Sequence, residues 1–158
     1  RGNPLIAIGA YCLMPNHFHI LIQEVAEKGI SRFMQKVGTA YAMYFNMKNQ
    51  RIGSLFVGPF RSRHVDKDSY LRQVAQYIHL NPADLYEREW KEGKVRNMRA
   101  LEDRLKVYEF SSLPDYLGGL QRVEAVLLDS DARATVGKLP PLTNVLRDAA
   151  EYHAELAL

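Results

Sequence analysis

Apolar and polar positions follow different periods along the chain, and each change of period marks an expected element. Residues 5–14 are mostly apolar, a Pro-Asn pair at 15–16 is a turn signal, and residues 17–23 resume the apolar run. This order predicts a β-hairpin. Over residues 30–45, apolar side chains recur every three or four positions, which predicts an amphipathic helix that Ser31 can cap.

The second third of the chain contains a strand-like stretch and a further helix. Leu55 to Val65 is strand-like but is interrupted by Gly58-Pro59. Asp66 or Asp68 can then cap a helix over about residues 70–80, which Asn81-Pro82 ends. Residues 87–94 are polar and irregular, and residues 110–119 are expected to form a loop with aromatic anchors. Helical patterns recur around 101–107, 123–128 and 142–156.

Two histidines lie one residue apart in the apolar run after the turn. His17 and His19 are at i and i+2 of the expected strand, so both imidazoles point to one side while Phe18 and Ile20 point to the other. Paired imidazoles on one face form half of a metal site. A lone histidine on a strand is more often structural. This pair, together with the helix downstream that carries Tyr77, favours metal ligation.

The helix expected to end at Pro82 carries the rest of the candidate chemistry. Tyr77 and Asn81 are four residues apart and share one helical face. If this face lies against the histidine strand, Tyr77 places a phenol beside the metal and Asn81 offers a carbonyl oxygen as a third ligand. Mg²⁺ or Mn²⁺ accepts mixed nitrogen and oxygen ligands and leaves positions for phosphate oxygens. The pattern predicts phosphoryl transfer with a tyrosine nucleophile and a covalent phosphotyrosine.

Composition and charge narrow the class of protein. The 158 residues suit about one domain, and the 47% hydrophobic content suits a buried core. No apolar run approaches a membrane span, and the single cysteine, Cys12, fits a reducing cytosol, so we expect a cytoplasmic protein without membrane contact. Residues 1–100 hold 15 Lys and Arg against 8 Asp and Glu, whereas residues 101–158 hold 6 against 10. The first part is therefore the expected polyanion binder.

Four segments carry a resemblance to a known family. The chain is similar to single-tyrosine HUH transposases of the insertion-sequence type, in particular to the REP-associated tyrosine transposases. The similarity covers about residues 5–118. The matching segments are Ala10-Tyr11-Cys12-Leu13-Met14-Pro15-Asn16-His17-Phe18-His19, Gly53-Ser54-Leu55-Phe56-Val57-Gly58, Tyr77-Ile78-His79-Leu80-Asn81-Pro82 and Phe110-Ser111-Ser112.

The resemblance implies an α+β fold, with a ferredoxin-like antiparallel sheet and helices packed on one face. It implies a catalytic domain over 1–118 and leaves 119–158 as a helical extension of unknown role. By resemblance, His17 and His19 are metal ligands and Tyr77 is the nucleophile, while Asn81 stands where related enzymes often carry glutamine. The implied activity is nicking and rejoining of single-stranded or hairpin DNA, with the 5′ phosphate on tyrosine and a free 3′ hydroxyl.

Several alternatives stay open from the sequence. The protein could be a domesticated binder of hairpin DNA that no longer transposes, or another HUH enzyme such as a plasmid relaxase or replication initiator. Arg61 and Arg63 alternate on the expected strand and are either DNA-backbone contacts or solvated charges. Tyr70 is a rival nucleophile, and His64 and His79 are expected at the surface or, at most, in contact with DNA. The active unit is a monomer or a homodimer. The family also begins with a strand that this chain would lack.

Overall fold

The computed structural model describes residues 3–118 and 122–156 and combines one antiparallel sheet with packed helices. The α+β class predicted from the sequence is confirmed. Within the described residues, the strands are β1 (Ile6–Leu13) and β2 (Phe18–Glu24). The longer helices are α1 (Gly29–Lys48), α2 (Asp68–Leu80) and α7 (Leu142–Leu156). Shorter helical segments are α3 (Ala83–Tyr86), η1 (Trp90–Glu92), α4 (Met98–Lys106), α5 (Leu113–Leu117), η2 (Val123–Leu127) and α6 (Ser130–Val136).

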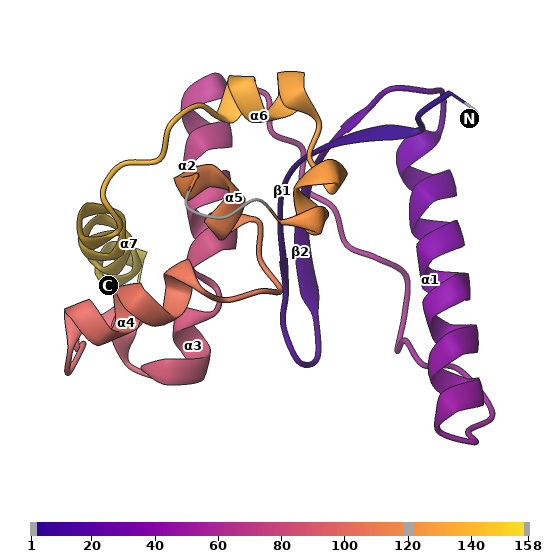
Figure 1. The fold of residues 1–158 in the computed structure, drawn as a ribbon, viewed down its shortest axis with the longest axis horizontal. Helices are drawn as coiled ribbons and strands as arrows, with labels where there is room; N and C mark the ends of the chain where they lie inside the picture. The colour runs from indigo at the N-terminus through magenta and orange to yellow at the C-terminus, as the bar shows by residue number, and fades with distance from the viewer. Residues whose placement is uncertain (1–2, 119–121, 157–158) are drawn as a thin grey trace.

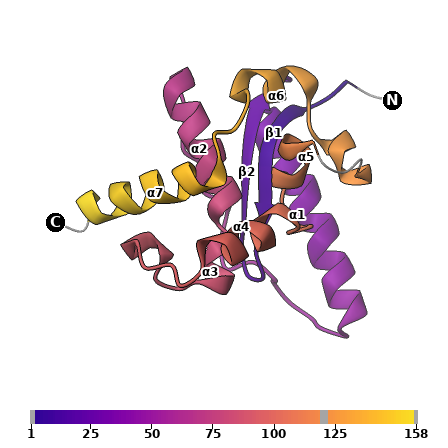
Figure 2. The ribbon, with the colours of Figure 1, turned by 60° about the vertical axis from the view of Figure 1, so that its left-hand side comes forward.

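The predicted hairpin is present, and it lies between α1 and α2 (Figures 1 and 2). The strands pair antiparallel, with Cys12 opposite His19 and Leu13 opposite Phe18. A register shift between Ile8 and Ala10 bends the ladder near its open end. Because β2 begins at Phe18, His17 is the last residue of the turn rather than the first residue of the strand. The closed end of the hairpin thus carries both histidines.

The start of α1 depends on close backbone contact rather than on the expected Ser31 cap. Ser31 lies inside the helix, which follows Lys28 in a left-handed conformation with φ of 55°. The cap prediction was therefore wrong. Glu24 of β2 takes the capping role, since its Oε2 accepts a hydrogen bond from the Ile30 N–H at 3.1 Å. A Cβ at Gly29 would lie 2.0 Å from the Leu5 carbonyl oxygen, so only glycine fits there.

The strand expected over residues 55–65 is not formed. In the part of the chain that the structure describes, this segment is irregular and pairs with neither strand. Its own sequence explains the difference, because Pro59 lacks the N–H that a ladder needs and the Ser54 hydroxyl donates locally to the Phe56 carbonyl at 2.6 Å. The segment crosses from α1 to α2 as an exposed connection (Figure 1).

Helix α2 covers the predicted range and packs on the hairpin. It ends at Leu80 as expected, but Lys67 precedes it without a side-chain cap, so neither Asp66 nor Asp68 caps it. Asp68 instead lies in the first turn, where its carboxylate faces the positive end of the helix dipole. The contact with the hairpin is built from small and medium apolar side chains, namely Ala10, Cys12, Ala75 and Ile78, together with Val136 of α6.

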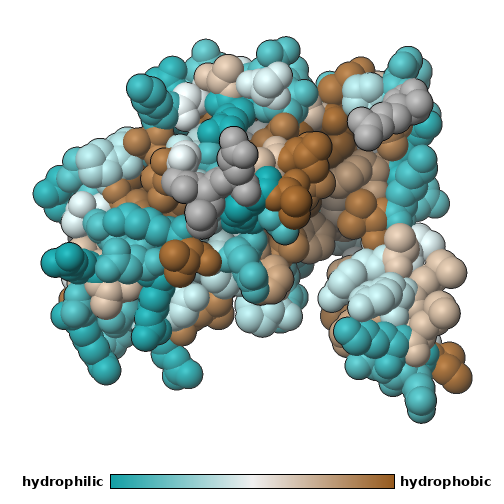
Figure 3. Space-filling view, viewed as in Figure 1, coloured by the Kyte–Doolittle hydropathy of each residue, from teal (hydrophilic) through white to brown (hydrophobic). Residues whose placement is uncertain are grey.

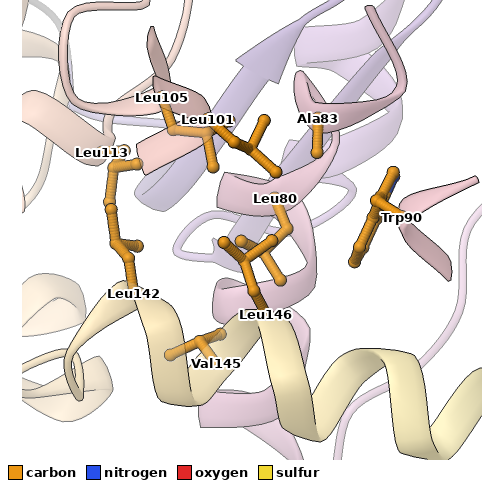
Figure 4. Packing of buried hydrophobic residues seen from close by; sticks show 9 residues of the cluster. All are labelled: Leu80, Ala83, Trp90, Leu101, Leu105, Leu113, Leu142, Val145 and Leu146. Atoms are coloured by element: carbon orange, nitrogen blue, oxygen red, sulfur yellow. The ribbon is translucent and has the colours of Figure 1, made fainter. Parts of the chain in front are cut away.

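A second apolar cluster joins α2 to the later part of the chain. Figure 4 shows side chains from α2, α3, η1, α4, α5 and α7 converging on Leu80 and Leu146. Trp90, in the stretch expected to be irregular, is 1% exposed and donates from its indole nitrogen to Asp84. Helix α6 was not expected from the sequence. The boundary at residue 118 stays a prediction, but α6 and α7 share buried clusters with α2.

Part of the surface between α1 and the remaining elements is apolar. Figure 3 shows hydrophobic side chains gathered there, and a groove in this region is lined by Ile6 and Ile8 of β1, Phe33 of α1 and Leu127 of η2. Among the described residues, no helix has the length and apolar character needed to cross a membrane.

Candidate functional site

The closed end of the hairpin holds the two histidines close together. The Met14 N–H donates to the His17 carbonyl at 2.8 Å and closes the turn. Nδ1 of His17 lies 2.7 Å from Oδ1 of Asn16. The imidazole centroids of His17 and His19 are 5.1 Å apart with perpendicular planes. The turn that was noted only as a Pro-Asn signal therefore also supplies a hydrogen-bond partner that orients one imidazole.

Helix α2 brings Tyr77 to the histidines. The Tyr77 and His19 ring centroids are 5.9 Å apart in an edge-to-face arrangement, and Tyr77 is 38% exposed. Asn81 follows one turn later and is buried at 3% exposure, with its Nδ2 donating to the Tyr77 carbonyl at 2.9 Å. This hydrogen bond satisfies a backbone carbonyl in the last turn of α2. It leaves Oδ1 as the Asn81 atom that can act as a ligand. The structure thus brings His17, His19 and Tyr77 together.

The electrostatic surroundings favour a neutral His19. Burial lowers the pKa of His19 below its usual 6.5, and the neighbouring His17 and Lys91 lower it further. A neutral imidazole keeps the lone pair that binds a metal ion. Lys91 itself is held by Asp84 at 2.9 Å. Its proximity to the site could not be read from the sequence, because η1 lies in a stretch without a clear pattern.

The residues present fit a divalent ion with mixed ligands. Two imidazoles share the hairpin end, and the hydrogen bond from Nδ1 of His17 to Asn16 leaves Nε2 as the ligating nitrogen. Groups of three or more His, Cys, Asp or Glu side chains suited to a metal do not occur within the described ranges. The third protein ligand predicted from the sequence is the amide of Asn81, and both the ion and this ligand stay predictions.

The predicted DNA contacts lie on the exposed connection between α1 and α2. Arg61 and Arg63 are both exposed, and the guanidinium of Arg63 lies 5.3 Å from the ring centroid of Tyr70. Because this segment is not a strand, the two side chains do not have the fixed common face that was expected. Their role in binding DNA stays a prediction.

The sequence led us to expect His79 at the surface, but the structure places it in the interior. It is 1% exposed, and its Nε2 lies 2.8 Å from Oγ of Ser112. Burial lowers the pKa of His79 to about 3, so the ring is neutral near pH 7. The expectation failed because the partner that accepts this side chain comes from a segment 33 residues later in the chain.

The comparison with protein families bears on the part of the chain that holds these side chains. Residues 4–81 match the model of the family described as transposase, IS200 like. This segment is therefore similar to the IS200-like transposases. It covers about half of the chain and includes His17, His19, Tyr77 and Asn81. No curated protein and no solved structure matched the chain.

The similarity to IS200-like transposases supports a DNA-processing role with DNA as the partner. The ranges within the match are β1, β2, α1 and α2, which are the elements that form the histidine and tyrosine cluster. Elements from α3 onward lie beyond it. The resemblance to the REP-associated branch, which rested partly on residues 110–112, is finer than this match and remains a proposal.

Proposed function

We propose that this IS200-like transposase nicks and rejoins single-stranded DNA through a covalent bond to Tyr77. The observation that carries the proposal is the edge-to-face contact of Tyr77 with His19, beside a second imidazole at the hairpin end. A phenol from a helix and two imidazoles from a hairpin are the donor types that a tyrosine nuclease needs within one small volume.

In the proposed reaction, the Tyr77 oxygen attacks a backbone phosphorus and loses its proton. A P–O bond forms to tyrosine while the P–O bond to the 3′ oxygen breaks, and the departing oxygen gains a proton to become a 3′ hydroxyl. The 5′ phosphate stays on the enzyme. Attack of a 3′ hydroxyl on this phosphotyrosine reverses the step and rejoins DNA, so the energy of the phosphodiester is kept.

His17, His19 and Asn81 would hold a Mg²⁺ or Mn²⁺ ion. When bound, such an ion would neutralise charge on the phosphate that is attacked. The chain supplies the positioning: Asn16 orients the His17 ring, and the hydrogen bond from Asn81 to the Tyr77 carbonyl fixes the end of α2. Positioning matters here because a phenol with a pKa near 10 is a weak nucleophile at neutral pH.

Hairpin DNA is the proposed substrate, in line with the REP-associated resemblance. The excess of positive charge in residues 1–100 suits a polyanion, and Arg61 and Arg63 would contact backbone phosphates without reading bases.

The test is adduct formation by the purified chain with labelled single-stranded hairpin DNA and Mn²⁺ or Mg²⁺. Wild type should give a covalent protein–DNA band on a denaturing gel, and the band should disappear with EDTA. Tyr77→Phe should lose the band but retain binding to the hairpin. Tyr70→Phe is the matched control, because it removes a phenol from the same helix and should leave the adduct intact.

An adduct that survives Tyr77→Phe would refute the assignment of the nucleophile. An adduct carried on the 3′ side of the nick would refute the proposed polarity. If wild type binds the hairpin but never cuts it with either ion, the domesticated binder becomes the better description.

A further inference from the structure

The proposed reaction leaves two buried polar side chains without a role. His79 is on α2, the helix that carries Tyr77. Ser112 belongs to the segment Phe110-Ser111-Ser112, which is one of the four that carry the family resemblance. They meet in the interior, with His79 Nε2 2.8 Å from Ser112 Oγ. His79 is 1% and Ser112 is 0% exposed, so this hydrogen bond is shielded from water.

Ser112 is fixed in turn to strand β1. Its Oγ accepts from the Tyr11 N–H at 2.9 Å and lies 3.2 Å from the Tyr11 carbonyl oxygen, while its own N–H donates to that carbonyl at 3.0 Å. A serine hydroxyl has one hydrogen to donate. The same oxygen lies 2.8 Å from Nε2 of His79, and the tautomer of the ring decides which of the two groups donates. The bridge therefore runs from α2 through Ser112 to the backbone of β1.

The remaining contact between α2 and β1 is apolar. It consists of Ala75 and Ile78 against Ala10 and Cys12, with Val136 of α6 packed beside them. Contacts between apolar side chains are non-directional, whereas a hydrogen bond requires one pair of atoms at a defined distance and angle. The buried hydrogen bond between α2 and a fixed point on the strand therefore adds a directional constraint to the apolar contact.

The bridge is close to the reacting groups along the chain on both sides. Tyr77 is two residues before His79 on α2. Tyr11 is adjacent to Cys12, whose partner across the hairpin is His19. A rotation of α2 that moved His79 away from Ser112 would therefore also move the Tyr77 ring relative to the His19 ring.

We propose that the His79–Ser112 hydrogen bond is a positioning device that holds Tyr77 beside His19. The two residues do not touch the DNA or the reacting atoms. They fix how α2 is seated on the hairpin, and so they set the approach of the phenol to the phosphate. This role rests on the proposed function for its consequence in catalysis, whereas the seating of α2 can be measured without DNA.

If the His79–Ser112 hydrogen bond positions α2 rather than holds the fold together, its removal should leave the protein folded. Nδ1 of His79 has no hydrogen-bond partner, so the buried pair carries a desolvation cost. Replacing both partners by apolar side chains removes the bond together with the unpaired Nδ1. Because Ser112→Ala also takes away the acceptor of the Tyr11 N–H, the folded state should persist with a modest loss of stability. The double variant His79→Leu with Ser112→Ala should therefore stay folded but seat α2 less accurately.

The experiment compares adduct formation in single turnover with hairpin binding for the full chain. Ser112→Ala and the double variant should slow adduct formation by roughly ten- to a hundredfold without changing hairpin affinity. His79→Gln, which retains a polar atom near the position of Nε2, should recover much of the rate. Ser111→Ala is the matched control, since Ser111 is equally buried but its Oγ accepts from Leu113 within its own segment. It should react like wild type.

Equal loss of rate in Ser111→Ala and Ser112→Ala, in proportion to lost stability, would overturn the proposal. A wild-type rate in the double variant would overturn it as well. Amide hydrogen exchange of residues 75–81 in the free protein separates this proposal from the proposed function. Faster exchange in Ser112→Ala than in Ser111→Ala supports the seating role even if wild type forms no adduct. Identical exchange in the two variants, with no adduct from wild type, would refute both.

Discussion

In the candidate site, two side chains are each held by a hydrogen bond from one polar atom, which leaves the other polar atom available for a ligand. The Nδ1 of His17 is engaged by Asn16, and the Nδ2 of Asn81 by the Tyr77 carbonyl. Each of these bonds restricts a ring or an amide that would otherwise rotate, so Nε2 and Oδ1 point in defined directions. Orientation of this kind costs no energy when a ligand binds, because folding has already fixed the side chains.

The buried His79 makes stability depend on pH. In the unfolded chain a histidine binds a proton near pH 6.5, whereas burial lowers the pKa of His79 to about 3 in the folded state. Between these values the unfolded state binds more protons, so stability falls as pH falls, by up to about 1.4 kcal/mol per pH unit. Urea unfolding gives the free energy of unfolding of wild type and of His79→Gln between about pH 4 and about pH 6.5, a range that lies between the two pKa values. The slope of this free energy against pH should be smaller for the variant. Parallel curves would contradict this reading.

Arg63 offers a test of the predicted DNA contacts at the level of one charge. If its guanidinium neutralises a phosphate, Arg63→Ala should reduce the slope of log affinity against log salt by about 0.7 for single-stranded DNA. Arg147→Ala, an exposed arginine of α7 outside the matched segment, should leave the slope unchanged. Fluorescence titrations over a range of salt concentrations measure both. An unaltered slope in Arg63→Ala would identify a solvated charge.

At the scale of elements, a segment from later in the chain helps to hold the hairpin. The hairpin is fixed by its ladder and by the segment after α4, because the Leu13 N–H donates to the Phe110 carbonyl and the Ser112 N–H to the Tyr11 carbonyl. This segment therefore runs along the outer edge of β1 and covers backbone groups that would otherwise be unpaired there. The Phe-Ser-Ser string thus has a definite place in the fold.

Two glycines of α1 predict opposite effects of the same substitution. At Gly29 an added Cβ would meet the Leu5 carbonyl oxygen at 2.0 Å, so Gly29→Ala should lower the free energy of unfolding by about 1–3 kcal/mol. At Gly38 the nearest atom would be a ring carbon of Phe56 at 3.9 Å, an ordinary contact. Gly38→Ala should therefore raise stability by about 0.5–1 kcal/mol through the higher helix propensity of alanine. Urea denaturation decides, and equal effects would contradict the described entry into α1.

For the whole molecule, the tyrosine helix is the element that the two apolar clusters share. Ala75 and Ile78 face the hairpin cluster, and Leu80 faces the cluster formed with the later helices. The family match ends at residue 81, but the support of α2 extends well beyond it. Residues remote from the histidines in sequence therefore contribute to the position of Tyr77.

Leu146 of α7 tests this dependence. It is 2% exposed in the cluster around Leu80, so Leu146→Ala should lower the free energy of unfolding by about 2–5 kcal/mol. Leu127→Ala makes the same chemical change at a residue that is 52% exposed and should cost far less. Thermal unfolding of both variants gives the comparison. Similar losses would show that α7 does not support α2 in this way.

Local pattern alone determined the parts of this protein that depend on near neighbours. The hairpin, α1, α2 and α7 followed from periodicity and turn residues, and the proximity of His17 to His19 followed from their spacing on one short segment. The end of α2 at Leu80 was also readable, because Asn81-Pro82 restricts the backbone there. These are features that a few adjacent residues fix without reference to the remaining chain.

Tertiary structure decided what depends on partners distant in sequence. Residues 55–65 have strand-like composition but found no strand to pair with, and a strand without a ladder is not stable in water. His79 is polar and its pattern gave no sign of burial, yet Ser112 provides a buried partner. The approach of Tyr77 to His19 required α2 to be seated on the hairpin. Such pairings depend on which surfaces pack together, and that is settled by the whole fold rather than by local sequence.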